Sequence, residues 1–287
     1  MTRAFLVTLF LEAALVICWS SGFIGAKLAS ETPAVFLLMF WRFLFTSVGL
    51  LPFVCIAFKK GMTARSFLIQ FLVGFLAMGV FLAFGVKSID LGVPVGTSAL
   101  ISALQPLMTV AMASLLLKED ISYRQWVGLF IGLFGVSVAV GGSSSTASSL
   151  AYTFAFLGVL AMVGATIVTK TVSKPLDLLP TLGIQCQAAT VLFFPLSIYE
   201  GTLIPTITQD FLFAIIWFVI FSTIGAYGFF WLCLRRSSTA RVSSLIYLTP
   251  PVTAIWAWLM FSEPITIFIL IGFAICFVGV VLAAKSD

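Results

Sequence analysis

The chain contains no histidine, and charged residues make up only 9% of its 287 positions. Without histidine the HExxH zinc motif cannot form, and neither a GxSxG motif nor a phosphate-binding loop occurs. A soluble domain carries roughly 25% charged residues, whereas hydrophobic residues make up 61% of this chain. We therefore expect an integral membrane protein that is neither an enzyme nor directly driven by ATP.

Cysteine is also scarce, and the net charge is only +5. The basic residues mostly flank apolar runs, so the charge requires no nucleic-acid partner. The five cysteines fall inside apolar runs without metal-ligand spacing. We expect them to pack, with no disulfide, metal or cofactor: Cys18, Cys55, Cys186, Cys233 and Cys276.

Ten apolar runs divide the sequence, and each can cross a hydrocarbon core of about 30 Å as a helix. Continuous runs of this length predict an all-α integral membrane protein with ten transmembrane helices. The runs lie near residues 4–27, 33–57, 66–88, 94–117, 122–140, 151–172, 178–199, 211–233, 241–261 and 265–284.

The segment 96–139 recurs in the second half of the chain. Pro106 aligns with Pro250, 144 positions later, and Glu119 aligns with Glu263 in the same gap-free register. Such self-similarity indicates duplication. We predict a first repeat over 1–142, a linker over 143–149 and a second repeat over 150–287. Each repeat has five helices, an odd number, so the second must be inverted in the membrane, as in secondary transporters built around a central cavity.

The basic residues are distributed unevenly between the two membrane faces. Of the 15 Lys and Arg residues, twelve fall on the side of the N-terminus, only Lys27 and Lys87 fall on the other side, and Arg42 lies within a helix. Cytoplasmic loops are enriched in Lys and Arg. We therefore expect a multi-pass protein of the inner (plasma) membrane with both termini in the cytoplasm.

Two ionisable residues lie deep in the first two helices. Glu12 is about 12 Å from the cytoplasmic end, and Arg42 reaches a similar depth from the other side. A charge facing lipid there costs at least about 2.5 kcal/mol. One hypothesis is a structural ion pair between them. The other is that Arg42 receives a substrate carboxylate or that Glu12 carries a proton.

Matched prolines interrupt the fourth and ninth helices near mid-membrane. Pro106, and the pair Pro250 and Pro251, cannot donate to the preceding turn. Paired interruptions of this kind point to a transport site, although a simple kink would have the same sequence. Neutral polar side chains surround them and suit an amphipathic small molecule: Ser98, Ser102, Gln105, Ser243, Ser244, Tyr247 and Thr249.

Aromatic residues supply further candidates for substrate contact. Trp19 can line the cavity or anchor the interface, while Tyr227 and Trp231 of the eighth helix need partners for their OH and NH groups. For Glu119 and Glu263 we favour a structural role beside the N-termini of the helices that follow them. Glycines in the fifth and tenth helices favour close packing, within the chain or between two protomers.

The run 225–283 resembles the EamA-type domain of the drug/metabolite transporter superfamily, as do 87–136, the WSSGFIGAKLA of the first helix and the WRF of the second. The resemblance covers essentially the whole chain. It implies a ten-helix exporter with helices 1, 3, 4, 6, 8 and 9 around the cavity and helices 5 and 10 at the ends. Glu12 is similar to the proton-carrying glutamate of smaller multidrug members.

Together these features predict a secondary transporter that exports a small amphipathic metabolite, an amino acid or a related compound, by alternating access around a midplane site. The alternatives are efflux of lipophilic cations with Glu12 as counter-charge, and uptake of a metabolite. Predicted partners are the substrate, the lipid bilayer and a proton as coupling ion, and the protein is a monomer or a homodimer. A non-transporting scaffold would not need the buried charges or the matched prolines.

Overall fold

A computed structural model describes residues 3–30, 34–117, 122–142, 147–170, 177–201, 203–234 and 245–284, which contain helices and no strand. The first half forms α1 (Arg3–Ser30), α2 (Val35–Lys59), α3 (Ala64–Gly74), η1 (Phe75–Val80), α4 (Phe81–Asp90), α5 (Val95–Ser102), α6 (Gln105–Leu117) and α7 (Tyr123–Gly141). The second half forms α8 (Ser149–Lys170), α9 (Leu178–Tyr199), α10 (Gln209–Trp217), η2 (Phe218–Gly225), α11 (Ala226–Leu234), α13 (Thr249–Phe261) and α14 (Ile267–Ala284).

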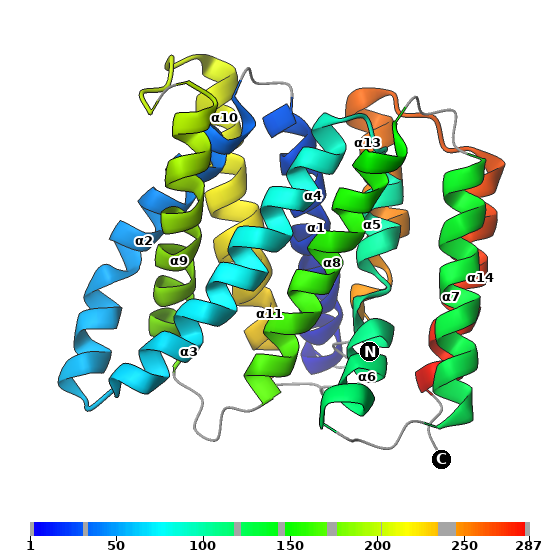
Figure 1. The fold of residues 1–287 in the computed structure, drawn as a ribbon, viewed down its shortest axis with the longest axis horizontal. Helices are drawn as coiled ribbons and strands as arrows, with labels where there is room; N and C mark the ends of the chain where they lie inside the picture. Colours follow the sequence, from blue (N-terminus) through cyan, green and yellow to red (C-terminus); the bar gives the residue numbers. More distant parts are fainter. Residues whose placement is uncertain are drawn as a thin grey trace.

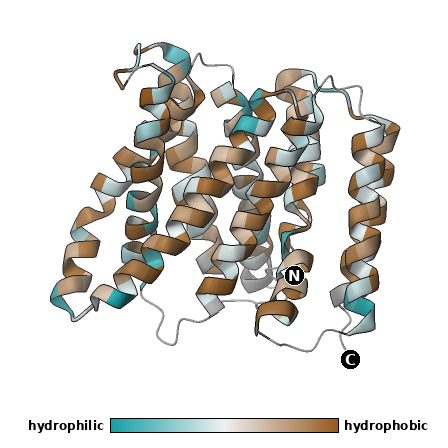
Figure 2. Ribbon diagram, viewed as in Figure 1, coloured by the Kyte–Doolittle hydropathy of each residue, from teal (hydrophilic) through white to brown (hydrophobic). Residues whose placement is uncertain are grey.

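The all-α membrane fold predicted from the sequence is confirmed. Where the structure describes them, the ten apolar runs coincide with a helix or with consecutive helices. Within the described residues, 8 helices are long and apolar enough to span a membrane, and the apolar segment Ile267–Leu282 is shorter. The run 241–261 is described from residue 245 onward, where it contains α13. Apolar residues cover the helix bodies, and hydrophilic ones gather near the two ends (Figure 2).

The second half of the chain is inverted relative to the first. Figure 1 shows α2 descending and its counterpart α9 ascending, and the same reversal relates α7 and α14. Both pairs pack along their lengths. The start of α1 and the end of α14 lie at the same end of the bundle, as an even number of crossings requires. The predicted inversion is therefore present in the backbone.

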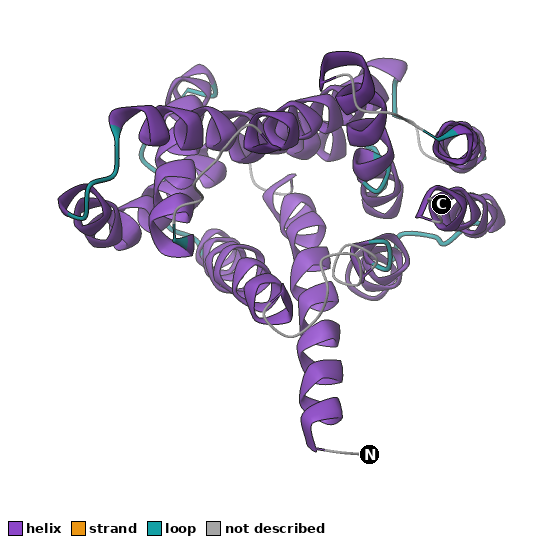
Figure 3. Cartoon of the chain, turned by 90° about the horizontal axis from the view of Figure 1, so that it is seen from below, coloured by secondary structure: helices purple, strands orange, loops and turns teal. Residues whose placement is uncertain are grey.

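The helices α7 and α14 form a closely packed pair at one edge of the bundle (Figures 1 and 3). A Cβ at Gly279 would lie 2.6 Å from the carbonyl oxygen of Gly128, and one at Gly135 would lie 2.7 Å from the sulfur of Cys276. Only glycine permits these approaches. The small-residue faces predicted from the sequence thus join the two repeats within one chain.

The two proline sites break their helices at equivalent positions. The fourth span stops at Ser102 and resumes at Gln105, with a tight turn in which the N–H of Leu104 donates to the carbonyl of Ile101 at 3.1 Å. In the second repeat, Leu248 occupies the turn that precedes α13, and its N–H donates to the carbonyl of Leu245 at 3.0 Å. Leu104 and Leu248 are repeat counterparts, so the break is duplicated with the sequence.

The third and eighth spans contain a second matched irregularity that the sequence reading missed. The π-helix η1 starts at Phe75 and η2 starts at Phe218, 143 positions later. A π-helical turn has one residue more than an α-helical turn and often occurs at functional sites. Both segments contribute residues to the cavity described below.

Candidate functional site

A cavity of about 130 Å³ lies at the centre of the bundle. A cavity needs at least roughly 10–15 Å³ to hold a single water, so this one is large enough for several waters or one small solute. Its walls come from α1, α2, the span η1–α4, α5, α6, α8, η2 and α11, together with Ile246 and Thr249. The ring of helices expected from the family resemblance is present, and α2 joins it through Arg42 and Phe43.

Most of the lining is apolar, and Arg42 is the one charged residue among the described residues that line the cavity. Its side chain is 4% exposed. The Nη2 group donates to Ser222 Oγ at 3.0 Å and to Thr223 Oγ1 at 3.2 Å, and Nε donates to the same Thr223 oxygen at 3.4 Å. The guanidinium is also stacked between two rings, 4.8 Å from Phe43 and 4.2 Å from Phe218.

Arg42 forms no ion pair with any residue that the structure describes. Hydroxyl groups and aromatic faces compensate a buried cation only partly, because the desolvation cost of an ion is several kcal/mol. Because no ion pair joins these two described residues, the Glu12–Arg42 pair considered from the sequence is not formed. The centre of the protein instead offers a buried positive charge that an anionic group can neutralise.

Aromatic residues stand beside this charge. Trp19 of α1 and Tyr227 of α11 both line the cavity, with ring centroids 5.9 Å apart. Ser102 and Gln105 line it at the break between α5 and α6, where Gln105 Nε2 donates to Thr166 Oγ1 at 3.2 Å. The arrangement combines one cation, neutral polar groups and flat apolar walls, which suits an amphipathic solute.

Comparison with known proteins decides the family. A model of the EamA-like transporter family matches residues 6–141 and again 149–285. The chain belongs to this family. This membership confirms the resemblance to the drug/metabolite transporter superfamily that the sequence showed.

Individual relatives match this EamA-family chain over only part of its length or at low sequence identity. An S-adenosylmethionine uptake transporter of Rickettsia prowazekii is 34% identical over 122 residues, which cover 41% of this chain and 38% of that protein. The matched part of the chain thus spans about two fifths of the length of the S-adenosylmethionine uptake transporters that it matches. The uncharacterized inner membrane transporter YedA of Escherichia coli K12 is 25% identical over 247 residues, covering 84% and 79% of the two chains. A solved crystal structure with 14% identity superposes with a TM-score of 0.61 over 96% of both chains, which shows the fold alone.

Five of the nine residues proposed from the sequence line the cavity: Trp19, Arg42, Ser102, Gln105 and Tyr227. Glu12 is buried but lies seven residues before Trp19, about 10 Å along α1. Tyr247 lines a separate apolar cavity of about 250 Å³ with Pro250, Pro251 and α14. The side chain of Trp231 and the whole of Ser243 lie outside the described residues.

Sequence reading missed the two hydroxyls that hold Arg42. Ser222 and Thr223 are unremarkable in the sequence, and only the inter-repeat packing of η2 against α2 brings them to the guanidinium. Small residues of α1 lie at the contact with η2. A Cβ at Gly25 would lie 2.5 Å from the Phe218 ring, and one at Gly22 would lie 3.1 Å from Ser222 Oγ.

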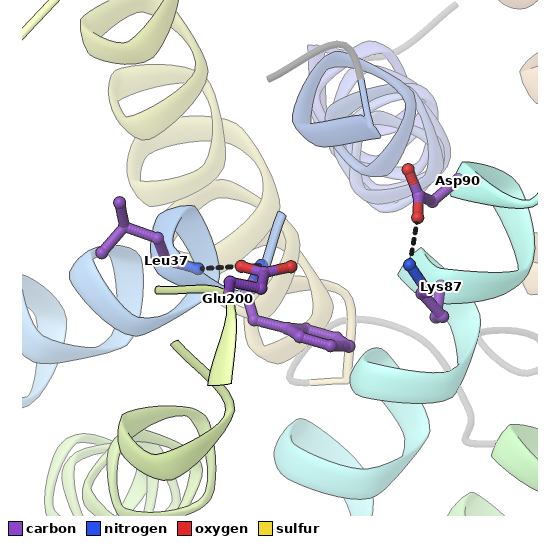
Figure 4. Close-up of polar contacts among 5 residues, drawn as sticks. Leu37, Lys87, Asp90 and Glu200 are labelled. Carbon is purple, nitrogen blue, oxygen red and sulfur yellow. Dashed lines mark hydrogen bonds and ion pairs between the residues drawn. The ribbon is translucent and has the colours of Figure 1, made fainter. Parts of the chain in front are cut away.

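The carboxylates of Glu200 and Glu263 each join the two repeats at the end of the bundle opposite the termini. Glu200, which follows α9, accepts from the N–H groups of Phe36 and Leu37 at 2.8 and 3.1 Å, while Lys87 pairs with Asp90 on α4 (Figure 4). Burial raises the pKa of Glu200, and the two N–H donors act in the opposite direction.

Glu263 plays a similar role for α5, accepting from the Val95 N–H at 2.9 Å. A structural role beside a helix N-terminus was expected for Glu263, and this contact provides one, but the capped helix is α5 of the other repeat and not the helix that follows Glu263. Glu119 lies outside the described residues. A capping box opens α7, with Ser122 and Gln125 bonded reciprocally.

Proposed function

We propose that the protein is a secondary transporter for a small amphipathic metabolite with a carboxylate, an amino acid or a close relative, moved by alternating access around the central cavity. The observation that carries the proposal is Arg42, a buried cation in the cavity wall without a carboxylate partner among the described residues. A substrate carboxylate would supply that partner through charge-assisted hydrogen bonds. The rings of Trp19 and Tyr227 would receive the less polar part.

The charge of the cavity argues against lipophilic cations as the main cargo. Such substrates need an acidic counter-charge in the cavity, and Glu12 lies about two helical turns away from its lining. Phosphorylated substrates are also disfavoured, because a single guanidinium cannot match several negative charges. The relatives named for S-adenosylmethionine uptake favour a zwitterionic metabolite of the amino acid type as the substrate class.

The direction of transport remains export in the proposal, and a proton is the proposed coupling ion. Glu12 is buried on α1, a helix that packs against α11, and is the carboxylate best placed to bind a proton inside a span. The end that carries Lys59, Lys60 and the two termini is proposed to face the cytoplasm of a cell bounded by an inner membrane. A reporter fused to the C-terminus would test this orientation.

Flux into liposomes tests the substrate class. The protein would be reconstituted and offered labelled amino acids, S-adenosylmethionine, and the decarboxylated amine of each substrate that moves. Losing one partner of a buried charge pair costs about 2–5 kcal/mol, so Arg42→Gln should raise the half-saturating concentration at least roughly 30-fold. Lys59→Gln, which removes an exposed charge from the end of the same helix, should leave flux unchanged. Equal flux of amines and amino acids would contradict the assignment of Arg42.

A pH gradient imposed on the same liposomes tests coupling. If Glu12 carries the proton, the gradient should accelerate flux in the wild type and have no effect on Glu12→Gln. Acceleration that persists in Glu12→Gln would remove Glu12 from the mechanism and leave the substrate site as proposed.

A further inference from the structure

The edge of Arg42 that would receive a carboxylate is occupied by neutral groups of the protein. A carboxylate binds a guanidinium through two parallel N–H···O bonds, and the Nε/Nη2 edge is one place where this geometry is possible. In the structure, Thr223 Oγ1 accepts from both of these nitrogens, at 3.4 and 3.2 Å. Ser222 Oγ takes a further bond from Nη2 at 3.0 Å. Oxygen atoms thus already lie where substrate oxygens would bind.

We propose that Ser222 and Thr223 are a neutral stand-in for the substrate carboxylate, and that substrate displaces them from Arg42 and so releases η2 from α2. This inference rests on the proposed function, because it requires that the substrate carry an anionic group to Arg42. It adds a step by which substrate binding at Arg42 changes the contact between the two repeats.

Displacement is favourable because the incoming group is charged. The bonds to Ser222 and Thr223 have one ionised partner, the guanidinium, whereas a carboxylate would make both partners ionised and add the attraction between opposite charges, which the low-dielectric surroundings strengthen. Before substrate binds, the two hydroxyls hold the Arg42 side chain in place, but they bind it more weakly than a carboxylate would. A solute without negative charge would leave them bound.

Release matters because these bonds cross the boundary between the repeats. Arg42 belongs to the first repeat and η2 to the second, and Phe218 at the start of η2 also lies against the guanidinium. The π-helical turn carries one extra residue, so it can relax where a regular α-helix cannot. On its other side, Gly22 and Gly25 let α1 approach η2 closely, so η2 remains packed against α1 when its bonds to α2 break.

The first test needs no substrate. Backbone amide exchange of residues 218–225 would be measured by mass spectrometry on the purified protein in lipid nanodiscs. Arg42→Gln should accelerate this exchange at least severalfold relative to wild type, because the guanidinium no longer holds η2. Lys59→Gln is the matched control and should not differ from wild type. Equal exchange in wild type and Arg42→Gln would overturn the inference.

The second test uses an amino acid that gives flux in the liposome assay. The double variant Ser222→Ala, Thr223→Val removes the competing hydroxyls, so the half-saturating concentration should fall about tenfold, and substrate should no longer change exchange at 218–225. Thr190→Val removes a hydroxyl that bonds only within α9 and should behave as wild type. Unchanged or weaker affinity in the double variant would refute the stand-in role. If no carboxylate-bearing solute moves, the proposed function fails, and the exchange of Arg42→Gln alone decides whether Arg42 holds η2.

Discussion

The contact between α1 and η2 makes a sharp prediction about Gly25. A methyl group at this position would lie 2.5 Å from Cε1 of Phe218 and under 3 Å from two more ring atoms, about 1 Å closer than normal van der Waals contact. The ring is 1% exposed and rests 4.2 Å from the Arg42 guanidinium. It cannot turn away without disturbing Arg42, so Gly25→Ala must push α1 and η2 apart or move the ring.

The expected change in the free energy of unfolding of Gly25→Ala follows from two opposing effects. Overpacking a filled interior costs about 1–3 kcal/mol, whereas replacing glycine by alanine within a helix returns about 0.5–1 kcal/mol. We expect Gly25→Ala to lower the free energy of unfolding by about 1–2 kcal/mol. Gly49→Ala on α2 is the control, because no heavy atom lies within 4 Å of its added Cβ, and it should be neutral or stabilising.

Denaturant unfolding in mixed micelles would measure these changes, and Phe218→Val supplies the decisive variant. Valine lacks the three ring atoms that clash with the new methyl, so the double variant should be at least about 1 kcal/mol more stable than the sum of the single changes predicts. Additive effects, or a Gly25→Ala variant as stable as Gly49→Ala, would refute the account of this contact.

Three further predictions concern the helix ends and the α7–α14 pair. Gly279→Ala should lower thermal stability more than Gly141→Ala, because its Cβ would meet a backbone oxygen at 2.6 Å whereas that of Gly141 meets nothing; equal midpoints would contradict the glycine interface. Ser122→Ala should cost about 0.5–2 kcal/mol of unfolding free energy by removing the capping box of α7, and Ser122→Asp should restore most of it. Burial raises the pKa of Glu263, although the Val95 N–H and Lys27 act in the opposite direction. Its contribution to stability is therefore greatest below pH 4.5 and is lost as pH rises through the raised pKa, so the thermal midpoint of wild type should fall relative to Glu263→Gln between pH 4.5 and 7.

The sequence predicted the scaffold well because membrane spans and duplication leave long, redundant signals. Ten apolar runs fix helices through length and composition alone. The shared register of Pro106 and Pro250 located both helix breaks, since a missing N–H acts wherever the chain folds. Burial depth likewise identified Arg42 as a residue that must face the protein interior.

Contacts that depend on rotation about a helix axis could not be predicted in the same way. Spacing gives the depth of Glu12 and Arg42 in the membrane but not which neighbour each faces, and the partners of Arg42 are the hydroxyls of η2. Tyr247 was placed correctly beside the helix break, yet its ring lies in a different cavity. The π-helical turns escaped notice because one extra residue in a helical turn leaves no mark in an apolar run.

The two repeats share one backbone fold, but only the first has a charged residue at the position of Arg42. This difference explains how a symmetric scaffold can hold one substrate. The repeat counterpart of Arg42 is Gln185, whose Nε2 donates to Gln70 Oε1 at 3.0 Å in a neutral contact between α9 and α3. Two cations at the centre would repel each other and would favour a doubly charged solute. With a neutral amide in the second copy, the cavity keeps a single positive site. In the proposed mechanism, the same Arg42 must then serve the substrate in both conformations, and the repeats supply equivalent movements rather than equivalent binding sites.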